Sequence, residues 1–185
     1  MTKAYSRFLA LLRGINVGGK NVIGKDDLRK CFEALGLGNV RTYIQSGNIL
    51  FRADPASVKE LTKAIEHGLS ERFAYQAQAV VLSYQKYKSA VQAAPDGWGR
   101  DEQQKHNAMF TLSGITPKRV LAQLPSPKAD IEWVSAGPGV IFWSVSKKEQ
   151  TKTTLMKLAA APVYQQMTVR NHNTVFKLLE LLESI

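Results

Sequence analysis

The feature that most constrains the fold is the spacing of apolar residues. This spacing switches between strand-like and helix-like along the chain, and the same series of switches occurs in both halves. In the first half, strand-like runs alternate with spans whose apolar residues recur every three or four positions, the period of a helix. The strand-like runs cover 7–13, 40–52 with a Ser-Gly-Asn turn at 46–48, and 76–83, and the helical spans cover 25–35 and about 54–73. The order is strand, helix, strand, strand, helix, strand.

The second half repeats this order without visible residue identity to the first. Its elements are a linking helix at 84–94, strands at 106–112, 130–135, 140–145 and 165–170, helices at 116–124 and 151–161, and a last helix at 173–184. The pattern predicts an α+β fold of two tandem ferredoxin-like (β-α-β-β-α-β) subdomains plus a C-terminal helix. We place the first subdomain at 1–83, and the linking helix, second subdomain and last helix at 84–185.

This topology predicts which loops meet. In a ferredoxin-like unit the first two strands run parallel, so the loop leaving strand one and the turn leaving strand two emerge at the same end of the sheet. Here those segments are residues 13–20 and 46–48, which lie almost 30 positions apart in the sequence. The sequence therefore predicts one composite site from two distant segments.

The chemistry of the first segment, Arg-Gly-Ile-Asn-Val-Gly-Gly-Lys, favours an anion. Glycines permit positive φ and inward-facing N–H groups, and Arg and Lys supply charge. The alternative is that Gly and Asn only build tight turns. The candidate ligand-binding residues are Arg13, Gly14, Asn16, Gly18, Gly19, Lys20, Gln45, Ser46, Gly47 and Asn48, with Arg170, Asn171 and Asn173 from a polar segment before the last helix. In that segment, Asn171 or Asn173 is expected to cap the helix.

The loop also satisfies the P-loop pattern G-x-x-x-x-G-K, but its context argues against a nucleotide hydrolase. Asn21 stands where a Ser or Thr hydroxyl would coordinate Mg²⁺, and the following helical pattern begins several residues late, at Lys25. Neither candidate partner strand ends in Asp. The loop is therefore interpreted as an anion-binding segment without NTPase activity.

Charge and apolar content limit the partners. The formal charge of +10 is spread evenly, at +5 in residues 1–84 (12 basic, seven acidic) and +5 in 85–185 (13 basic, eight acidic). Such a balance favours an anionic small molecule or nucleic acid as partner. No apolar stretch approaches the roughly 20 residues of a membrane span, and the N-terminal run does not resemble a signal peptide, so we expect a cytoplasmic protein without a membrane partner. The single cysteine, Cys31, is expected to be a small buried residue.

Other catalytic signals are weak. The three histidines, His67, His106 and His172, do not pair with one another or with Cys31 at metal-ligand spacing, so no metal site, cofactor or catalytic residue is assigned. Three aromatic residues flank the second hairpin, and they are expected in the core or in packing between subdomains rather than as base-stacking surfaces. These residues are Trp133, Phe142 and Trp143.

Three blocks of the sequence resemble one family. They are ALLRGINVGGKN at 10–21, VRTYIQSGNILF at 40–51 and RNHNTVFKLLEL at 170–181, and they resemble the bacterial family known as domain of unknown function sixteen-ninety-seven. The resemblance covers nearly the whole chain and implies a cytoplasmic α+β protein of two ferredoxin-like subdomains. The family usually has Trp where this chain has His172, which leaves the role of that ring open. The resemblance implies no activity.

The leading hypothesis is a cytoplasmic protein that binds an anionic ligand at the Gly-rich loop and the adjacent hairpin. The ligand would be a phosphate-bearing metabolite, a nucleotide or a nucleic acid. One alternative is an enzyme acting on a phosphorylated or carboxylate small molecule by charge stabilisation. A second is a structural or protein-interaction module. The sequence does not decide between them, nor does it fix the oligomeric state.

Overall fold

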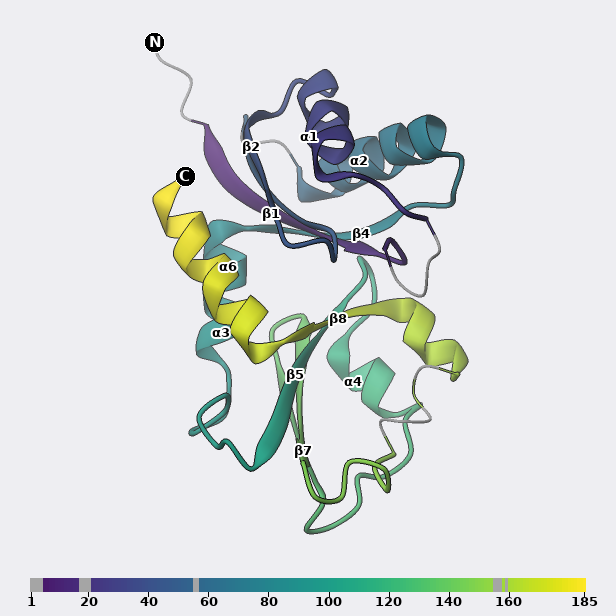
Figure 1. Ribbon diagram of the computed structural model, residues 1–185, viewed down its shortest axis with the longest axis vertical. Coiled ribbons are helices and arrows are strands. Elements are labelled where there is room, and N and C mark those ends of the chain that lie inside the picture. The colour runs from purple at the N-terminus through teal and green to yellow at the C-terminus, as the bar shows by residue number, and fades with distance from the viewer. Residues whose placement is uncertain (1–4, 17–20, 55–56, 155–157, 159) are drawn as a thin grey trace. The chain divides into compact units, whose positions relative to one another are not determined.

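The computed structural model describes residues 5–16, 21–54, 57–154, 158 and 160–185 (Figure 1). The chain divides into two compact units. Unit 1 comprises residues 1–87 and 178–185, and unit 2 comprises residues 88–177.

Unit 1 contains a four-stranded antiparallel sheet in the order β2-β3-β1-β4. Its elements are β1 (Ser6–Arg13), α1 (Lys25–Ala34), β2 (Gly38–Tyr43), β3 (Asn48–Ala53), α2 (Val58–Phe73) and β4 (Gln78–Ser83). The central strand β1 pairs with β3 on one side and β4 on the other. This order is the ferredoxin-like arrangement that the sequence predicts.

Unit 2 contains a second sheet with the equivalent order, β6-β7-β5-β8. Its elements are β5 (Gln104–Thr111), α4 (Pro117–Leu121), β6 (Glu132–Gly137), β7 (Val140–Ser146), the 3₁₀-helix η1 (Pro162–Gln166) and β8 (Met167–Asn171). The helix expected over 151–161 includes residues 155–157 and 159, which lie outside the described residues. The two four-stranded sheets confirm the predicted duplication.

Two helices connect the units along the chain. They are α3 (Tyr84–Gln92) and α6 (His172–Ser184), and the unit boundaries fall within both. The part of α6 that belongs to unit 1 is anchored through its carbonyl groups. Arg7 Nη1 donates to the carbonyl oxygens of Leu182 and Glu183, each at 3.0 Å, and Arg52 Nη2 donates to that of Ile185 at 2.7 Å. Strand side chains thus satisfy carbonyls that the end of a helix leaves open.

The core of unit 1 lies between its sheet and the two helices α1 and α2, which cover one face (Figure 1). Phe51 of β3 is at its centre, with ring centroids 5.7 Å from Phe8 and 5.6 Å from Phe32. Cys31 of α1 belongs to this core and is 3% exposed, as expected. Burial raises the pKa of its thiol, so the group is poorly suited to act as a nucleophile.

The core of unit 2 confirms one aromatic prediction and contradicts another. Trp143 of β7 is 1% exposed and belongs to the same core cluster as Met109, Val120 and Val163. Trp133 of β6, however, is 46% exposed, so the expectation that it packs in the core is wrong. The physical reason is strand alternation, because neighbouring residues of a strand point to opposite faces. Glu132, the residue before Trp133, takes the buried position.

Several element boundaries differ from the sequence prediction by a few residues. Helix α4 ends at Leu121 rather than Leu124, and its N-cap is Thr116, whose hydroxyl accepts from the N–H of Arg119 at 3.3 Å. The strands of the second hairpin continue to Gly137 and resume at Val140, which leaves a tighter turn than expected. No helix within the described residues is both long and apolar enough to cross a bilayer.

Candidate functional site

The loop after β1 and the turn after β2 are joined, as the topology predicts. Strands β1 and β2 both run antiparallel to β3, so they point the same way and end at the same edge. The backbone N–H of Leu12 donates to the carbonyl of Gly47 at 2.7 Å. Asn16 Nδ2 donates to the carbonyl of Gln45 at 2.8 Å. Two segments about 30 positions apart therefore form one continuous surface in unit 1.

Asn16 holds the described part of the Gly-rich loop in shape. Besides Gln45, its Nδ2 donates to the carbonyl of Ile23 at 3.1 Å, and its Oδ1 accepts from the N–H of Ile23 at 2.9 Å. The backbone N–H of Asn16 donates to Asn21 at 3.2 Å, and Asn21 Nδ2 donates back to the carbonyl of Gly14 at 2.8 Å. The loop is thus closed across its base, and both amide side chains serve its conformation.

Positive backbone angles explain why these residue types are needed. Gly14, Asn16 and Asn21 have φ of 73°, 54° and 46°. Glycine and asparagine adopt this left-handed region more readily than other residues do. The amide side chains of Asn16 and Asn21 therefore stabilise a left-handed backbone conformation that asparagine adopts more readily than most residues do.

The hairpin turn is equally constrained. Gly47 has φ of 70°, and a Cβ added there would lie 2.8 Å from Leu12 Cβ, so only glycine fits. Asn48 is 1% exposed, and its Nδ2 donates to the carbonyl of Tyr43 and to Ser46 Oγ, each at 3.0 Å. Ile44 has φ of 48°, which is unusual for a β-branched residue, and it is 40% exposed. Such outliers often accompany functional sites.

The groups that remain accessible at this surface are few. Gly14, Asn21 and Gln45 are exposed, whereas Arg13, at the end of β1 and opposite Gln78 of β4, is half-buried. Three of the predicted residues, Gly18, Gly19 and Lys20, lie outside the described residues. Among the residues that the structure describes here, the exposed groups are thus backbone, Asn21 and Gln45, and Arg13 lies at the end of β1 from which the loop leaves.

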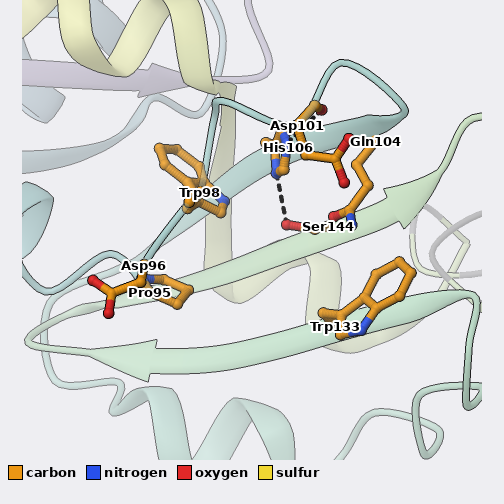
Figure 2. A pocket seen from close by; sticks show the side chains of 9 residues that line it. Pro95, Asp96, Trp98, Asp101, Gln104, His106, Trp133 and Ser144 are labelled. Carbon is orange, nitrogen blue, oxygen red and sulfur yellow. Dashed lines mark hydrogen bonds between the residues drawn. The ribbon is translucent and has the colours of Figure 1, made fainter.

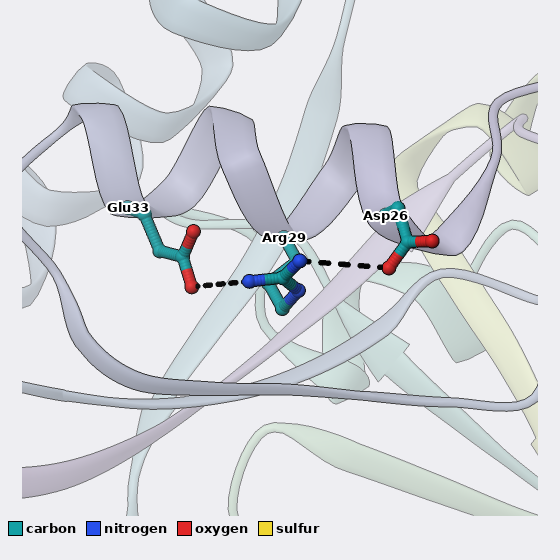
Figure 3. A network of polar contacts seen from close by, with 3 residues as sticks. All are labelled: Asp26, Arg29 and Glu33. Carbon is teal, nitrogen blue, oxygen red and sulfur yellow. Dashed lines mark hydrogen bonds and ion pairs between the residues drawn. The ribbon is translucent and has the colours of Figure 1, made fainter.

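The start of α1 adds both signs of charge near the loop. The helix begins at Lys25, and Gly24 is its N-cap. Asp26 and Asp27 occupy the first turn, where carboxylates are favoured by the helix dipole. Arg29 lies 3.6 Å from Asp26 and 2.9 Å from Glu33, and Figure 3 shows it between them. The carboxylates of the first turn weaken the attraction of this helix end for an anion.

The second group of predicted residues belongs to unit 2. Arg170 is 7% exposed, and its Nη1 donates to Thr168 Oγ1 at 2.7 Å and to the carbonyl of Val169 at 2.8 Å. Asn171 Oδ1 accepts from the N–H of Thr174 at 2.9 Å, which confirms that Asn171 caps α6. Asn173 is exposed in the first turn of that helix. The groups around residues 13–16 and 170–173 thus occur in different units.

Unit 2 also contains a pocket that sequence reasoning missed, with a volume of about 360 Å³. At its base, His106 Nδ1 lies 2.8 Å from Ser144 Oγ (Figure 2). These two residues are 38 positions apart and meet because they are directly opposite in the β5–β7 register. The pocket is lined by Pro95, Asp96, Gly97, Trp98, Asp101, Gln104, His106, Trp133 and Ser144. The available sequence signal was the Pro-Asp-Gly-Trp-Gly segment at 95–99, which places a large aromatic residue between two turn-forming glycines.

Comparison with known proteins identifies the family. The family model described as protein of unknown function (DUF1697) matches residues 5–142, well over half of the chain. The chain belongs to this family. The match includes the first two blocks that carry the resemblance, whereas the third block lies beyond it.

A solved structure supports the same relationship. The conserved bacterial protein SP0830 from Streptococcus pneumoniae is 31% identical to this chain, with a TM-score of 0.87. The alignment covers 97% of this chain and 99% of that one. No curated protein matches the chain.

Proposed function

We propose that this DUF1697 protein is cytoplasmic and binds the anionic group of a phosphate-bearing metabolite, a nucleotide or a nucleic acid. The binding site is the loop at 13–20 together with the turn at 45–48. The observation that carries the proposal is the pair of hydrogen bonds by which Asn16 ties the loop to Gln45 and Ile23. This arrangement fixes a glycine-containing loop in advance beside a basic side chain.

The proposal assigns different roles to the candidate residues. Asn16, Ser46, Gly47 and Asn48 set the shape of the site, because their polar groups or backbone angles are already used within it. Backbone N–H groups, Gln45 and the cations Arg13 and Lys20 contact the ligand. Preorganisation of the described part of the loop favours affinity, because residues that are already fixed lose less conformational entropy on binding. Arg170, Asn171 and Asn173 are left out of this assignment, because Arg170 and Asn171 have structural partners in unit 2.

The charge of the whole chain favours the same class of ligand. The formal charge of +10 attracts anions from solution. An Arg guanidinium can form two parallel hydrogen bonds to a phosphate, and a Lys ammonium adds a point charge. Asp26 and Asp27 limit this attraction, so a compact phosphate held by the loop is preferred to one held at the start of α1.

The test is calorimetric titration and thermal denaturation with inorganic phosphate, pyrophosphate, nucleoside monophosphates and triphosphates, and short RNA and DNA. An anion at 100 times its Kd stabilises the folded state by about 2.7 kcal/mol. For a chain of this length, that corresponds to a rise in Tm of about 5–11 °C. Analysis of the incubated ligand by phosphorus NMR separates simple binding from turnover by an enzyme.

Variants make the test specific to the site. Arg13→Gln and Lys20→Gln should each weaken binding about 10- to 100-fold, which corresponds to a lost charge-assisted hydrogen bond. Lys59→Gln is the matched control, because Lys59 is exposed near the start of α2, which follows the end of β3 that is farthest from the turn. Arg13→Lys separates charge from guanidinium geometry. If no anion stabilises the protein, or the three Gln variants bind equally well, the proposal is wrong.

A further inference from the structure

We propose that the pocket of unit 2 is a second site, which binds an uncharged planar heterocycle carrying a C=O next to an N–H, such as the lactam edge of a nucleobase. Trp98 donates to the ligand carbonyl, the Ser144 hydroxyl accepts from the ligand N–H, and Trp133 provides a surface for stacking. This site is independent of the anion site proposed for unit 1.

The backbone of the loop at 95–100 fixes the position of Trp98 through two turns and two glycines with positive φ. The backbone N–H of Trp98 donates to Pro95 at 2.9 Å, and the N–H of Arg100 donates to Gly97 at 3.0 Å, so two successive turns flank it. Gly97 and Gly99 have φ of 77° and 82°, and a Cβ on Gly99 would lie 2.7 Å from the Phe176 ring. These constraints hold the indole in one place.

The ring of Trp98 is buried among other aromatic rings of unit 2. Its centroid lies 5.0 Å from that of Phe142, 5.5 Å from Phe176, 6.0 Å from His106 and 6.3 Å from His172, all in edge-on arrangements. Such contacts fix the orientation of the ring. The packing of these rings therefore sets the direction in which the indole N–H of Trp98 points.

The indole N–H of Trp98 lacks an acceptor within the described residues, although the side chain is 5% exposed. Figure 2 shows the nitrogen on the side of the ring that faces Ser144. A buried donor without a partner is unfavourable, and most such donors in proteins are satisfied by protein or a bound molecule. A ligand oxygen in the pocket would supply the missing acceptor.

His106 determines the hydrogen-bonding role of Ser144. His106 Nε2 lies 3.1 Å from the carbonyl oxygen of Asp101, which can only accept, so Nε2 carries the proton. In the neutral ring, Nδ1 is then the acceptor and the Ser144 hydroxyl donates to it. The remaining lone pairs of the Ser144 oxygen can accept from a ligand. The base of the pocket thus presents a donor, from Trp98, close to an acceptor, from Ser144.

The walls select for a planar and uncharged molecule. Trp133 is 46% exposed and lies across Ser144 from Trp98 (Figure 2), so a flat ring can stack on it while its edge reaches the base. Asp96 and Asp101 are exposed and line the pocket, which disfavours phosphates. A purely cationic ligand has no acceptor to offer the Trp98 N–H. The volume of about 360 Å³ suits a ligand of metabolite size.

The experiment uses the full chain labelled with ¹⁵N, titrated with uridine and with guanosine. The three tryptophans give three indole N–H signals, which the variants Trp98→Phe and Trp133→Phe assign. We expect the Trp98 signal to move the most on binding, because its proton gains an acceptor. Trp143 lies in the core cluster of the unit and does not line the pocket, so its signal is the internal reference.

Affinity measurements complete the test. Trp98→Phe keeps an aromatic side chain and removes the indole N–H donor, and it should weaken uridine binding at least tenfold, as should Ser144→Ala. Followed through the Trp98 signal, uridine monophosphate should bind the pocket more weakly than uridine because of the exposed carboxylates of Asp96 and Asp101. The inference is overturned if neither nucleoside moves the Trp98 signal at millimolar concentration, if the Trp98 signal responds to the monophosphate at a lower concentration than to uridine, or if a quaternary ammonium probe such as choline competes for the change in that signal. Should Trp98→Phe not fold, the uridine affinity of Ser144→Ala decides instead, because an unchanged affinity in that variant also overturns the inference.

Discussion

Replacing Asn16 with Ala tests whether this residue is the support of the Gly-rich loop. The change removes three hydrogen bonds, two donated by Nδ2 at 2.8 and 3.1 Å and one accepted by Oδ1 at 2.9 Å. Each contributes about 0.5–1.5 kcal/mol net to stability. It also leaves an alanine in the left-handed region at φ of 54°, where asparagine is better tolerated, and this difference costs about 1 kcal/mol.

These contributions are not fully additive, because the three bonds share one side chain. We therefore expect Asn16→Ala to lower the free energy of unfolding by about 2–4 kcal/mol. Asn39→Ala is the matched control. Asn39 also has positive φ, at 49°, and is exposed, and its side chain makes no hydrogen bond to any residue that the structure describes. The control should cost about 1 kcal/mol, from backbone conformation alone.

The assay is urea unfolding followed by far-ultraviolet circular dichroism. The three tryptophans all lie in unit 2, so their fluorescence does not report directly on the Asn16 region. Hydrogen exchange of the amides at 12–16 and 44–48 gives an independent local measure, and it should speed up in Asn16→Ala only. If the two variants have equal stability and equal exchange, the amide of Asn16 does not support the loop, and the preorganised site proposed for unit 1 loses its basis.

Two further predictions follow from the structure. Gly47→Ala should lower the free energy of unfolding by about 2–4 kcal/mol, because the added Cβ would contact Leu12 and the backbone φ is unfavourable for alanine. Gly14→Ala is the control and should cost only about 1–2 kcal/mol from its φ, because its added Cβ meets no described atom within 4 Å. Equal losses of stability in urea unfolding would refute the steric argument. Burial, followed by the charge of His106, lowers the pKa of His172 below its ordinary 6.5. The unfolded chain then binds the proton more readily, so stability should be lost as the pH falls below about 6.5, and His172→Gln should reduce that loss; a His172 pKa at or above 6.5 by NMR titration would contradict this.

The sequence by itself determined what depends on local pattern. The spacing of apolar residues predicted the order of strands and helices, and that order in turn predicted that the loop after β1 meets the turn after β2. The preference of asparagine for helix N-caps identified Asn171. These predictions succeeded because periodicity, turn residues and caps act over a few neighbouring positions, and a β-α-β-β-α-β order permits few topologies.

Only the tertiary structure decided how individual polar side chains are used. Asn16 resembles a ligand-binding residue in sequence, yet its amide is occupied by Ile23 and Gln45, and the Arg170 guanidinium is buried within unit 2. The His106–Ser144 pair depends on the register of two strands, and the orphaned indole N–H of Trp98 depends on packing around its ring. Register and packing bring together residues far apart in the chain, and a one-residue shift of a strand would turn every side chain to the other face. For that reason the sequence predicted where a site could form, while the fold decided which atoms face it.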